Sequence, residues 1–249
     1  MSDFTNAELM TVAAARELRS DQSCLVGVGR PSTAAILAKR LHAPGLTLIY
    51  ESGTLGADPE RVPLSIGDNE LATTATAVVP VAEIFNYWLQ PGRISVGFLG
   101  AAQIDRFGNL NTTVIGEYEH PRTRLPGAGG APEIATACPE IVVTVPHSRR
   151  AFVPELDFVT SVCGSTSADG AGDAAQSMVV VTDHCVMRTG DDGELELTEL
   201  FPGVTVADVQ EQTGWELRTV ENPGTVADPT PDELAGLRSL NDTSKGRKK

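Results

Sequence analysis

The run of residues from Cys24 to Tyr50 constrains the fold more than any other part of the chain. An apolar stretch at 24–29 ends in a glycine turn, residues 32–41 have the pattern of a helix, and residues 46–50 are again apolar. A strand, a helix and a second strand within thirty residues make a βαβ unit, whose strands run parallel. We therefore predict an α/β fold with a single open, largely parallel sheet and helices on both faces.

Other segments fit the same class. Residues Thr5 to Glu8 have the form of a capping box, so a helix is expected to begin there. Short β-branched runs without alternation are typical of strands buried on both faces. Further helices are predicted at 79–89 and 204–213, strands at 94–99, 112–115, 141–145, 178–181 and 194–197, and loops at 120–132 and 165–176.

The composition changes near the C-terminus. From about Asn222 the chain is rich in proline, aspartate and threonine, and Thr230 to Glu233 form a second capping box with proline at the first helical position. A chain of 249 residues can bury one sizeable core. We predict one domain at 1–221 and a loosely attached tail at 222–249 that can form a short helix.

Charge and cysteine usage exclude several classes of protein. The 33 acidic residues outnumber the 19 basic ones, which disfavours nucleic acid as a partner. No run of 18 apolar residues is present, and the N-terminus lacks a signal pattern, so a cytoplasmic protein that does not enter the membrane is expected. The four cysteines are far apart and are expected to be reduced and buried. The histidines are scattered, so no metal site is predicted.

The segment from Tyr50 to Ala57 is the strongest candidate for chemistry. Glu51 leaves the end of an apolar strand and enters a turn with two glycines. Ligands of open α/β sheets bind at the carboxyl ends of strands, and glycines let the backbone approach a ligand closely. By position alone, Glu51 also fits an ordinary solvated loop residue.

A dinucleotide site is the main rival for this region. Gly27 and Gly29 follow the first strand, open a helix, and precede an acidic residue at the end of the next strand. The pattern departs from the fingerprint because Ser32 occupies the third small position and Pro31 removes an N–H where phosphates would bind. No G-x-S-x-G elbow or other hydrolase triad is visible.

Four segments together resemble the β subunits of family I CoA-transferases. They are residues 26–32, 50–57, 98–111 and 125–131, in matching order and spacing, and the similarity extends over 5–221. Residues 63–68 and 113–121 resemble the 3-oxoadipate branch of the family. The Glu-Ser-Gly form at position 51 is shared with glutaconate CoA-transferase β subunits.

This resemblance implies that Glu51 is the nucleophile. Its carboxylate would attack a thioester and later carry CoA as a glutamyl-CoA thioester, which is covalent catalysis. A glutamate is ionised at neutral pH without an activating base, so the missing triad is expected. Coenzyme A is then a substrate and a covalent intermediate, and no permanently bound cofactor is expected.

The resemblance also assigns supporting residues. Each transfer passes through an oxyanion, which fixed N–H donors stabilise. The loop that binds the oxyanion and the acyl group would be Gly129, Gly130 and Ala131. The residues that orient the substrate would be Asn111 and Gln103. The residues that support the loop would be Gly27, Gly29, Ser52 and Gly53. Without the resemblance, residues 129–131 fit an ordinary turn. Asn111 then fits a side-chain amide that hydrogen-bonds the backbone of a turn.

The resemblance further implies a partner and a substrate class. A separate α subunit would complete a heterodimer or heterotetramer that moves CoA from succinyl-CoA to 3-oxoadipate, a step of aromatic catabolism. The alternatives are a glutaconate-type transferase, an acyl-CoA hydrolase, or a non-catalytic or dinucleotide-binding partner subunit. Arg149 and Arg150 are candidates for contact with CoA phosphates or substrate carboxylates, although paired arginines are often just solvated.

Overall fold

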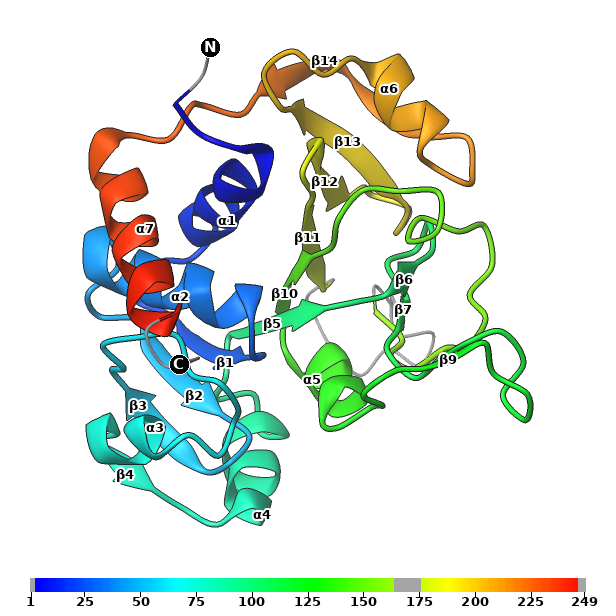
Figure 1. Ribbon diagram of the computed structural model, residues 1–249. Helices are drawn as coiled ribbons and strands as arrows, with labels where there is room; N and C mark the ends of the chain where they lie inside the picture. Colours follow the sequence, from blue (N-terminus) through cyan, green and yellow to red (C-terminus); the bar gives the residue numbers. More distant parts are fainter. Residues whose placement is uncertain (1–2, 164–175, 246–249) are drawn as a thin grey trace. The chain divides into compact units, whose positions relative to one another are not determined.

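The chain forms two compact units. Figure 1 colours the ribbon along the sequence, from blue at the N-terminus to red at the C-terminus. The computed structural model describes residues 3–163 and 176–245. The first unit comprises Met1–Leu99 and Asp228–Lys249, and the second comprises Gly100–Ala227. The predicted loop at 165–176 lies outside the described residues except for Gln176.

The first unit contains the predicted βαβ element. Strand β1 runs parallel to both β2 and β5, and α2 connects β1 to β2. Strand β3 is antiparallel to both β2 and β4, so the order within this unit is β5-β1-β2-β3-β4. The bounds are β1 (Ser23–Val26), α2 (Arg30–Leu41), β2 (Thr47–Tyr50), β3 (Thr54–Ala57), β4 (Ala77–Val78) and β5 (Val96–Gly100).

The predicted first helix is confirmed. Helix α1 (Asn6–Arg16) begins after Thr5, whose hydroxyl accepts a hydrogen bond from the Glu8 N–H at 3.2 Å. The Glu8 carboxylate accepts one in return from the Thr5 N–H at 2.9 Å. This reciprocal pair satisfies two donors that a helix start leaves free, which is why the helix begins here.

The predicted helix at 79–89 has an unusual form. A single turn, α4 (Val81–Glu83), continues as a π-helix over Ile84–Leu89. A π-helix has hydrogen bonds between residues five apart, and the Gln90 N–H accordingly donates to the Phe85 carbonyl at 2.9 Å. A short helix, α3 (Asn69–Thr74), precedes it and is capped by Asp68.

The second unit contains five further strands. Strand β10 is parallel to β11, β12 is antiparallel to its neighbours β11 and β13, and β13 is parallel to β14. Their bounds are β10 (Glu140–Thr144), β11 (Ser177–Val181), β12 (Cys185–Thr189), β13 (Leu195–Leu200) and β14 (Arg218–Thr225). The unit also holds α5 (Ala131–Ala137) and α6 (Val206–Glu211).

Two small antiparallel ladders complete the second unit. Strand β6 (Gln103–Ile104) pairs with β7 (Leu110–Asn111), and β8 (Val114–Ile115) pairs with β9 (Thr123–Arg124). The single strand predicted at 112–115 is therefore wrong in its bounds. The Asn111 side chain accepts from the Thr113 N–H at 3.0 Å, and this local turn separates β7 from β8.

The C-terminal segment is an integral part of the first unit and not a loose tail. The predicted capping box at Thr230 opens helix α7 (Pro231–Lys245), which packs on α1 and α2. Leu237 and Leu240 are buried in that contact. The predicted boundary between residues 221 and 222 falls inside β14.

The predicted α/β class with an open sheet is confirmed. The strand pairs are of mixed direction, with parallel pairs in both units and antiparallel pairs at β3, β4 and β12. All four cysteines are free and buried, as predicted. No helix in the described part of the chain is long and apolar enough to cross a membrane.

Candidate active site

Glu51 lies at the start of a tight turn between β2 and β3 in the first unit. Tyr50 and Thr54 face each other in the antiparallel pair, so the connection consists of the three residues Glu51, Ser52 and Gly53. The turn is closed by a hydrogen bond from the Gly53 N–H to the Tyr50 carbonyl at 3.0 Å. Glu51 is half-buried, whereas Tyr50 before it is fully buried. The turn therefore holds a carboxylate at the end of a rigid strand.

Gly53 is required by this turn for two reasons. Its φ is +107°, a region that side chains with a Cβ rarely adopt. A Cβ built on it would lie 2.0 Å from the Val79 carbonyl oxygen. The Val79 N–H donates to the Gly53 carbonyl at 2.9 Å, so the backbone approach fixes the turn against the residue that follows β4.

A second turn leaves the same end of the parallel strands. Leu25 of β1 pairs with Ile49 of β2, so Gly27 and Glu51 each come two residues beyond a matched pair. Gly27 donates to the Phe98 carbonyl at 2.9 Å and accepts from the Ser32 hydroxyl at 2.9 Å. Gly29 then turns the chain with φ +91° into α2. The predicted loop-supporting residues of this unit are thus found at one sheet end.

Two hydroxyls beside Glu51 have no hydrogen-bond partner among the described residues. Ser52 Oγ and Thr54 Oγ1 are both shielded from solvent, and Thr54 is only 3% exposed. A buried hydroxyl without a partner costs about 1–3 kcal/mol, so such groups in a native fold call for an explanation. Sequence reasoning included Ser52 only as loop support and missed Thr54.

The two predicted orienting residues, Asn111 and Gln103, meet in the second unit. They face each other across β6 and β7, and Asn111 Nδ2 donates to Gln103 Oε1 at 2.7 Å. Asn111 Nδ2 also donates to the Val114 carbonyl at 2.7 Å, and its oxygen accepts from Thr113 N–H at 3.0 Å. Asn111 is fully buried, and both hydrogens of its side-chain amide are donated within the chain, to Gln103 and to Val114.

Gln103 links this pair to a carboxylate. Its Nε2 donates to Asp157 Oδ2 at 3.1 Å, and its Oε1 also accepts from the Asp157 N–H at 3.2 Å. Asp157 Oδ2 accepts from the Gly116 N–H at 2.9 Å as well. Gln103 and Asp157 line a pocket of about 690 Å³ together with Arg122, Arg149 and Arg150. The roles of Asp157 and Arg122 in this pocket carried no signal in the sequence.

The predicted oxyanion loop, Gly129 to Ala131, leads into α5 in the same unit. Gly129 has φ +51°, and Gly130 caps the helix without a side-chain hydrogen bond. The Ala131 N–H donates to the Ala128 carbonyl at 3.0 Å, so this donor is already used. The Gly129 N–H has no acceptor among the described residues.

The topology argues against a dinucleotide-binding unit. In a doubly wound nucleotide fold, the strand with the acidic residue is followed by a helix and another parallel strand. Here β2 turns directly into the antiparallel β3 after the three residues from Glu51 to Gly53. The sequence pattern did not predict β3, because the short run Thr54–Ala57 looked like the continuation of a loop.

A buried cysteine–histidine pair in the second unit was not predicted. His147 Nδ1 lies 3.7 Å from Cys185 Sγ, and His147 Nε2 lies 3.1 Å from Thr213 Oγ1. Thr213 donates its own hydrogen to the Val209 carbonyl at 2.8 Å. His147 Nε2 must therefore donate to Thr213, which leaves Nδ1 to accept from the Cys185 thiol.

This pair is built to stay neutral. Burial raises the pKa of Cys185 to about 12 and lowers the pKa of His147 to about 4. Asp183 accepts from the His147 backbone N–H at 2.7 Å and contacts the His184 ring, so it does not orient the His147 ring. A nucleophilic cysteine needs a thiolate, and this arrangement disfavours one. The pair is a packing element of the second unit.

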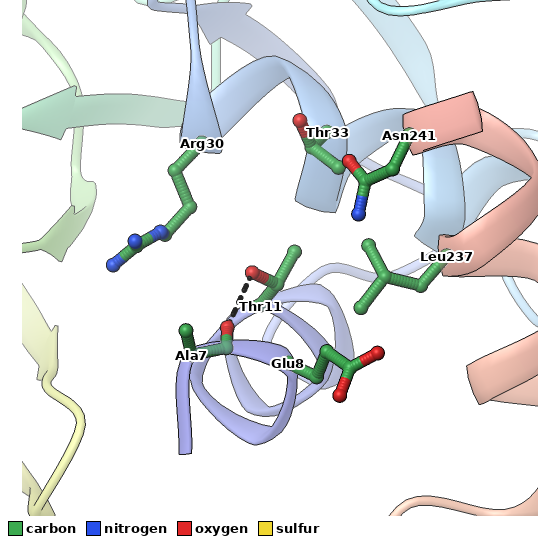
Figure 2. A pocket seen from close by; sticks show the side chains of 7 residues that line it. All are labelled: Ala7, Glu8, Thr11, Arg30, Thr33, Leu237 and Asn241. Carbon is green, nitrogen blue, oxygen red and sulfur yellow. Dashed lines mark hydrogen bonds between the residues drawn. The ribbon is translucent and has the colours of Figure 1, made fainter. Parts of the chain in front are cut away.

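Another cavity, of about 310 Å³, lies between α1, α2 and α7 in the first unit. Figure 2 shows that the side chains of Arg30 and Glu8 extend from its wall in different directions. Glu8 accepts from Arg238 Nε at 2.8 Å, and Arg30 donates to the Met10 sulfur. The charged groups therefore do not converge on a ligand position. Within residues 3–163 and 176–245, no group of three metal-ligating side chains is found.

Comparisons with known proteins identify the family. The coenzyme A transferase family matches residues 7–212. A 3-oxoadipate CoA-transferase subunit from Pseudomonas knackmussii is 51% identical over 249 residues, covering 96% of this chain and 94% of that protein. A glutaconate CoA-transferase subunit from Acidaminococcus fermentans is 34% identical over 227 residues, covering 87% and 85%. The solved glutaconate coenzyme A-transferase from Acidaminococcus fermentans has a TM-score of 0.85 at 32% identity, covering 95% and 94%. The chain therefore belongs to the coenzyme A transferase family.

Proposed function

We propose that this chain is the β subunit of a CoA-transferase that moves CoA from succinyl-CoA to 3-oxoadipate. The observation that carries the proposal is the 51% identity to a 3-oxoadipate CoA-transferase subunit over almost the full length of both chains. Coenzyme A is a substrate, as in the family as a whole. The four buried free thiols suit the reducing cytoplasm, where we place the enzyme.

Glu51 is the proposed nucleophile. Its carboxylate attacks the thioester carbon, the C–S bond breaks, and CoA thiolate leaves an acyl-glutamyl anhydride behind. The thiolate then attacks the glutamyl carbon, releases the donor acid and forms a glutamyl-CoA thioester. The acceptor carboxylate reverses these two steps and regenerates Glu51, with no net proton change. Covalent catalysis of this kind divides one difficult exchange into easier ones.

Gly129 is the N–H donor that we assign to the oxyanion of each step. Its backbone φ of +51° and its unused N–H support the assignment. Gly130 and Ala131 then shape the loop and the acyl-binding surface, and the Ala131 N–H closes the turn onto Ala128. Losing one oxyanion donor typically costs about 3–4 kcal/mol of barrier.

Gln103 and Asn111 act together in this proposal. The Asn111 amide hydrogens are both used, so Asn111 is a positioning residue that holds Gln103 Oε1. Gln103 Nε2 gives one hydrogen to Asp157 and keeps the second for a ligand in the pocket that it lines. This division of roles follows from the donor count of the two amides.

A separate α subunit is the proposed partner, in a heterodimer or heterotetramer. The two CoA-transferase relatives, which match over most of their length, are themselves subunits of their enzymes, and this supports a two-chain enzyme. Strand β4 ends the strand order of the first unit and is exposed, with Val78 61% and the nearby Val81 53% exposed. An exposed apolar strand edge is a site where another chain can pack.

Glutaconate-type transfer is the second candidate, because a glutaconate CoA-transferase subunit is 34% identical. Acyl-CoA hydrolysis is a further alternative, in which water replaces the acceptor acid. Two measurements separate these outcomes: the new acyl-CoA formed from succinyl-CoA with 3-oxoadipate or with glutaconate, and the free CoA released with no acceptor. Transfer to 3-oxoadipate at the highest rate supports the proposal, and acceptor-independent release supports a hydrolase.

Trapping the covalent intermediate tests the mechanism. The chain co-expressed with its partner subunit is mixed with succinyl-CoA and reduced with borohydride, which converts the glutamyl thioester carbonyl to an alcohol. Peptide mass spectrometry is expected to locate the reduced residue at position 51. Glu51→Ala should abolish both the adduct and the activity, whereas Glu60→Ala, which removes an exposed carboxylate of the same unit, should keep both. Turnover without a Glu51 adduct would refute the mechanism.

A further inference from the structure

The pocket beside Gln103 carries a local positive charge in an acidic protein. Three guanidinium groups line it, from Arg122, Arg149 and Arg150, against the single carboxylate of Asp157. The chain as a whole has a formal charge of −14. An anionic substrate is repelled by such a surface in general, so a concave site with excess positive charge stands out as a place for one.

The Asp157 carboxylate does not neutralise the arginines. Asp157 Oδ2 accepts from Gln103 Nε2 and from the Gly116 N–H, and Arg122 Nη2 is 4.0 Å away from it. At that distance, and with the Arg122 side chain 78% exposed, the ion pair is weak. The guanidinium of Arg122 therefore remains available to another anion.

The other two arginines also keep free donors. Arg149 Nη1 donates to the Thr213 carbonyl at 3.1 Å, which holds the side chain in place and leaves its remaining N–H groups unused. Arg150 has no hydrogen bond or ion pair with any described residue. Three arginines from two separate loops thus present unused N–H groups to one pocket.

Gln103, which lines the pocket, is held in place by hydrogen bonds. Gln103 is 5% exposed and is held from both sides by Asn111 and Asp157. A group that binds at the arginines would therefore meet a fixed wall and not a mobile one. Guanidinium groups recognise the paired oxygens of carboxylates and phosphates through two parallel hydrogen bonds.

We infer that this pocket binds an anionic group of the substrates that lies away from the reacting carbonyl. The inference rests on the proposed function, in which a dicarboxylic acid has a carboxylate that does not react and CoA has phosphates. Both supply the same chemistry, paired anionic oxygens. Binding energy from such a remote group is used to orient the reacting end of a substrate. The pocket volume of about 690 Å³ leaves room for more of the molecule than the anion alone.

The test measures binding without turnover. Adipate, which has carboxylates but no phosphate, and free CoA, which has phosphates but no carboxylate, are titrated calorimetrically into the complex with the partner subunit. The variants are Arg150→Gln and Arg122→Gln. The control is Arg124→Gln, which removes the same charge from β9 but does not line the pocket. Thermal unfolding confirms that each variant is folded.

The inference predicts that both pocket variants weaken one of these ligands about tenfold, a typical effect for the loss of a charged hydrogen bond. If only the affinity for adipate falls, the pocket binds a carboxylate. If only the affinity for CoA falls, it binds a phosphate. Arg124→Gln should change either affinity less than about twofold. Equal affinities for wild type and both variants, with either ligand, would overturn the inference.

The same experiment separates this inference from the proposed function. If wild type binds ligands through the arginines but transfers no CoA, the function is wrong and the pocket assignment stands. If wild type transfers CoA to 3-oxoadipate and the arginine variants bind and turn over normally, the function stands and the pocket assignment falls.

Discussion

Asn111 donates a hydrogen bond from Nδ2 to Oε1 of Gln103 at 2.7 Å, and the two residues are direct partners across β6 and β7. The contact connects a fully buried amide to a residue that lines the basic pocket. It gives Asn111 a physical role even though its own donors are used: it sets the position of Gln103.

Asn111→Ala is expected to destabilise the protein by about 2–4 kcal/mol. The change leaves the Val114 carbonyl and the Thr113 N–H without their buried partner and creates a small cavity. Urea unfolding of the complex measures the loss. Asn241→Ala is the matched control, because that half-buried amide makes no hydrogen bond to a described residue, and it should cost less than about 0.5 kcal/mol. Equal losses would contradict a positioning role.

Gly53→Ala is expected to cost at least about 3 kcal/mol and to abolish transfer. The new Cβ would lie 2.0 Å from the Val79 carbonyl oxygen, and the backbone φ of +107° adds conformational strain. Gly92→Ala should cost only about 1–2 kcal/mol, because its φ is +73° but nothing lies within 4 Å of a built Cβ. Denaturation midpoints and activity of both variants check this difference.

Ser52→Ala separates stability from catalysis at the Glu51 turn. The buried hydroxyl has no partner among the described residues, so its removal should leave the free energy of unfolding unchanged or slightly raise it. If the hydroxyl donates to a bound substrate, kcat/KM falls about tenfold or more. A stability loss with normal kinetics would show that the hydroxyl serves the fold, contrary to this expectation.

Arg16→Gln should weaken the attachment of helix α7. Arg16 Nε and Nη2 donate to the two oxygens of Glu233 at 2.8 and 2.7 Å, a bidentate pair that is mostly shielded from solvent. The expected loss is about 1–2 kcal/mol, with faster hydrogen exchange in residues 231–240. Arg122→Gln, which removes a 4.0 Å ion pair of a highly exposed side chain in the second unit, should have little effect on either measurement.

Acidification should destabilise the second unit through His147. Burial, followed by the nearby His184, lowers the pKa of His147 to about 4, while Asp183 acts in the opposite direction. The unfolded chain, with a histidine pKa near 6.5, then binds more protons between pH 6.5 and pH 4. Stability is therefore full above pH 6.5 and falls as the pH approaches 4, by up to about 3 kcal/mol from this residue.

His147→Asn tests this assignment. The variant is less stable at pH 7 because it loses the stacking of the imidazole on the Phe152 ring, whose centroids lie 3.9 Å apart. Its stability should nevertheless change less between pH 6.5 and pH 4 than that of wild type. Parallel pH profiles for the two proteins would assign the acid sensitivity to other groups. Glu8, with a pKa lowered to about 2 chiefly by Arg238, loses its contribution only below about pH 4.5.

Local sequence was sufficient to predict the elements that depend on near neighbours in the chain. The βαβ unit follows from three consecutive hydrophobic patterns, and the starts of α1 and α7 follow from capping residues three positions apart. The place of Glu51 at a strand end was also predictable, because a glutamate followed by glycines ends an apolar strand. These predictions succeed because the interactions behind them span only a few residues.

Contacts between distant side chains, in contrast, emerge only when the whole chain is folded. Gln103 and Asp157 are 54 positions apart, Arg16 and Glu233 are 217 apart, and His147 finds Cys185 across 38. Such contacts depend on strand register and on the packing of whole elements, which local patterns do not encode. For the same reason the C-terminal segment looked like a tail in the sequence, although its apolar face is buried against α1 and α2.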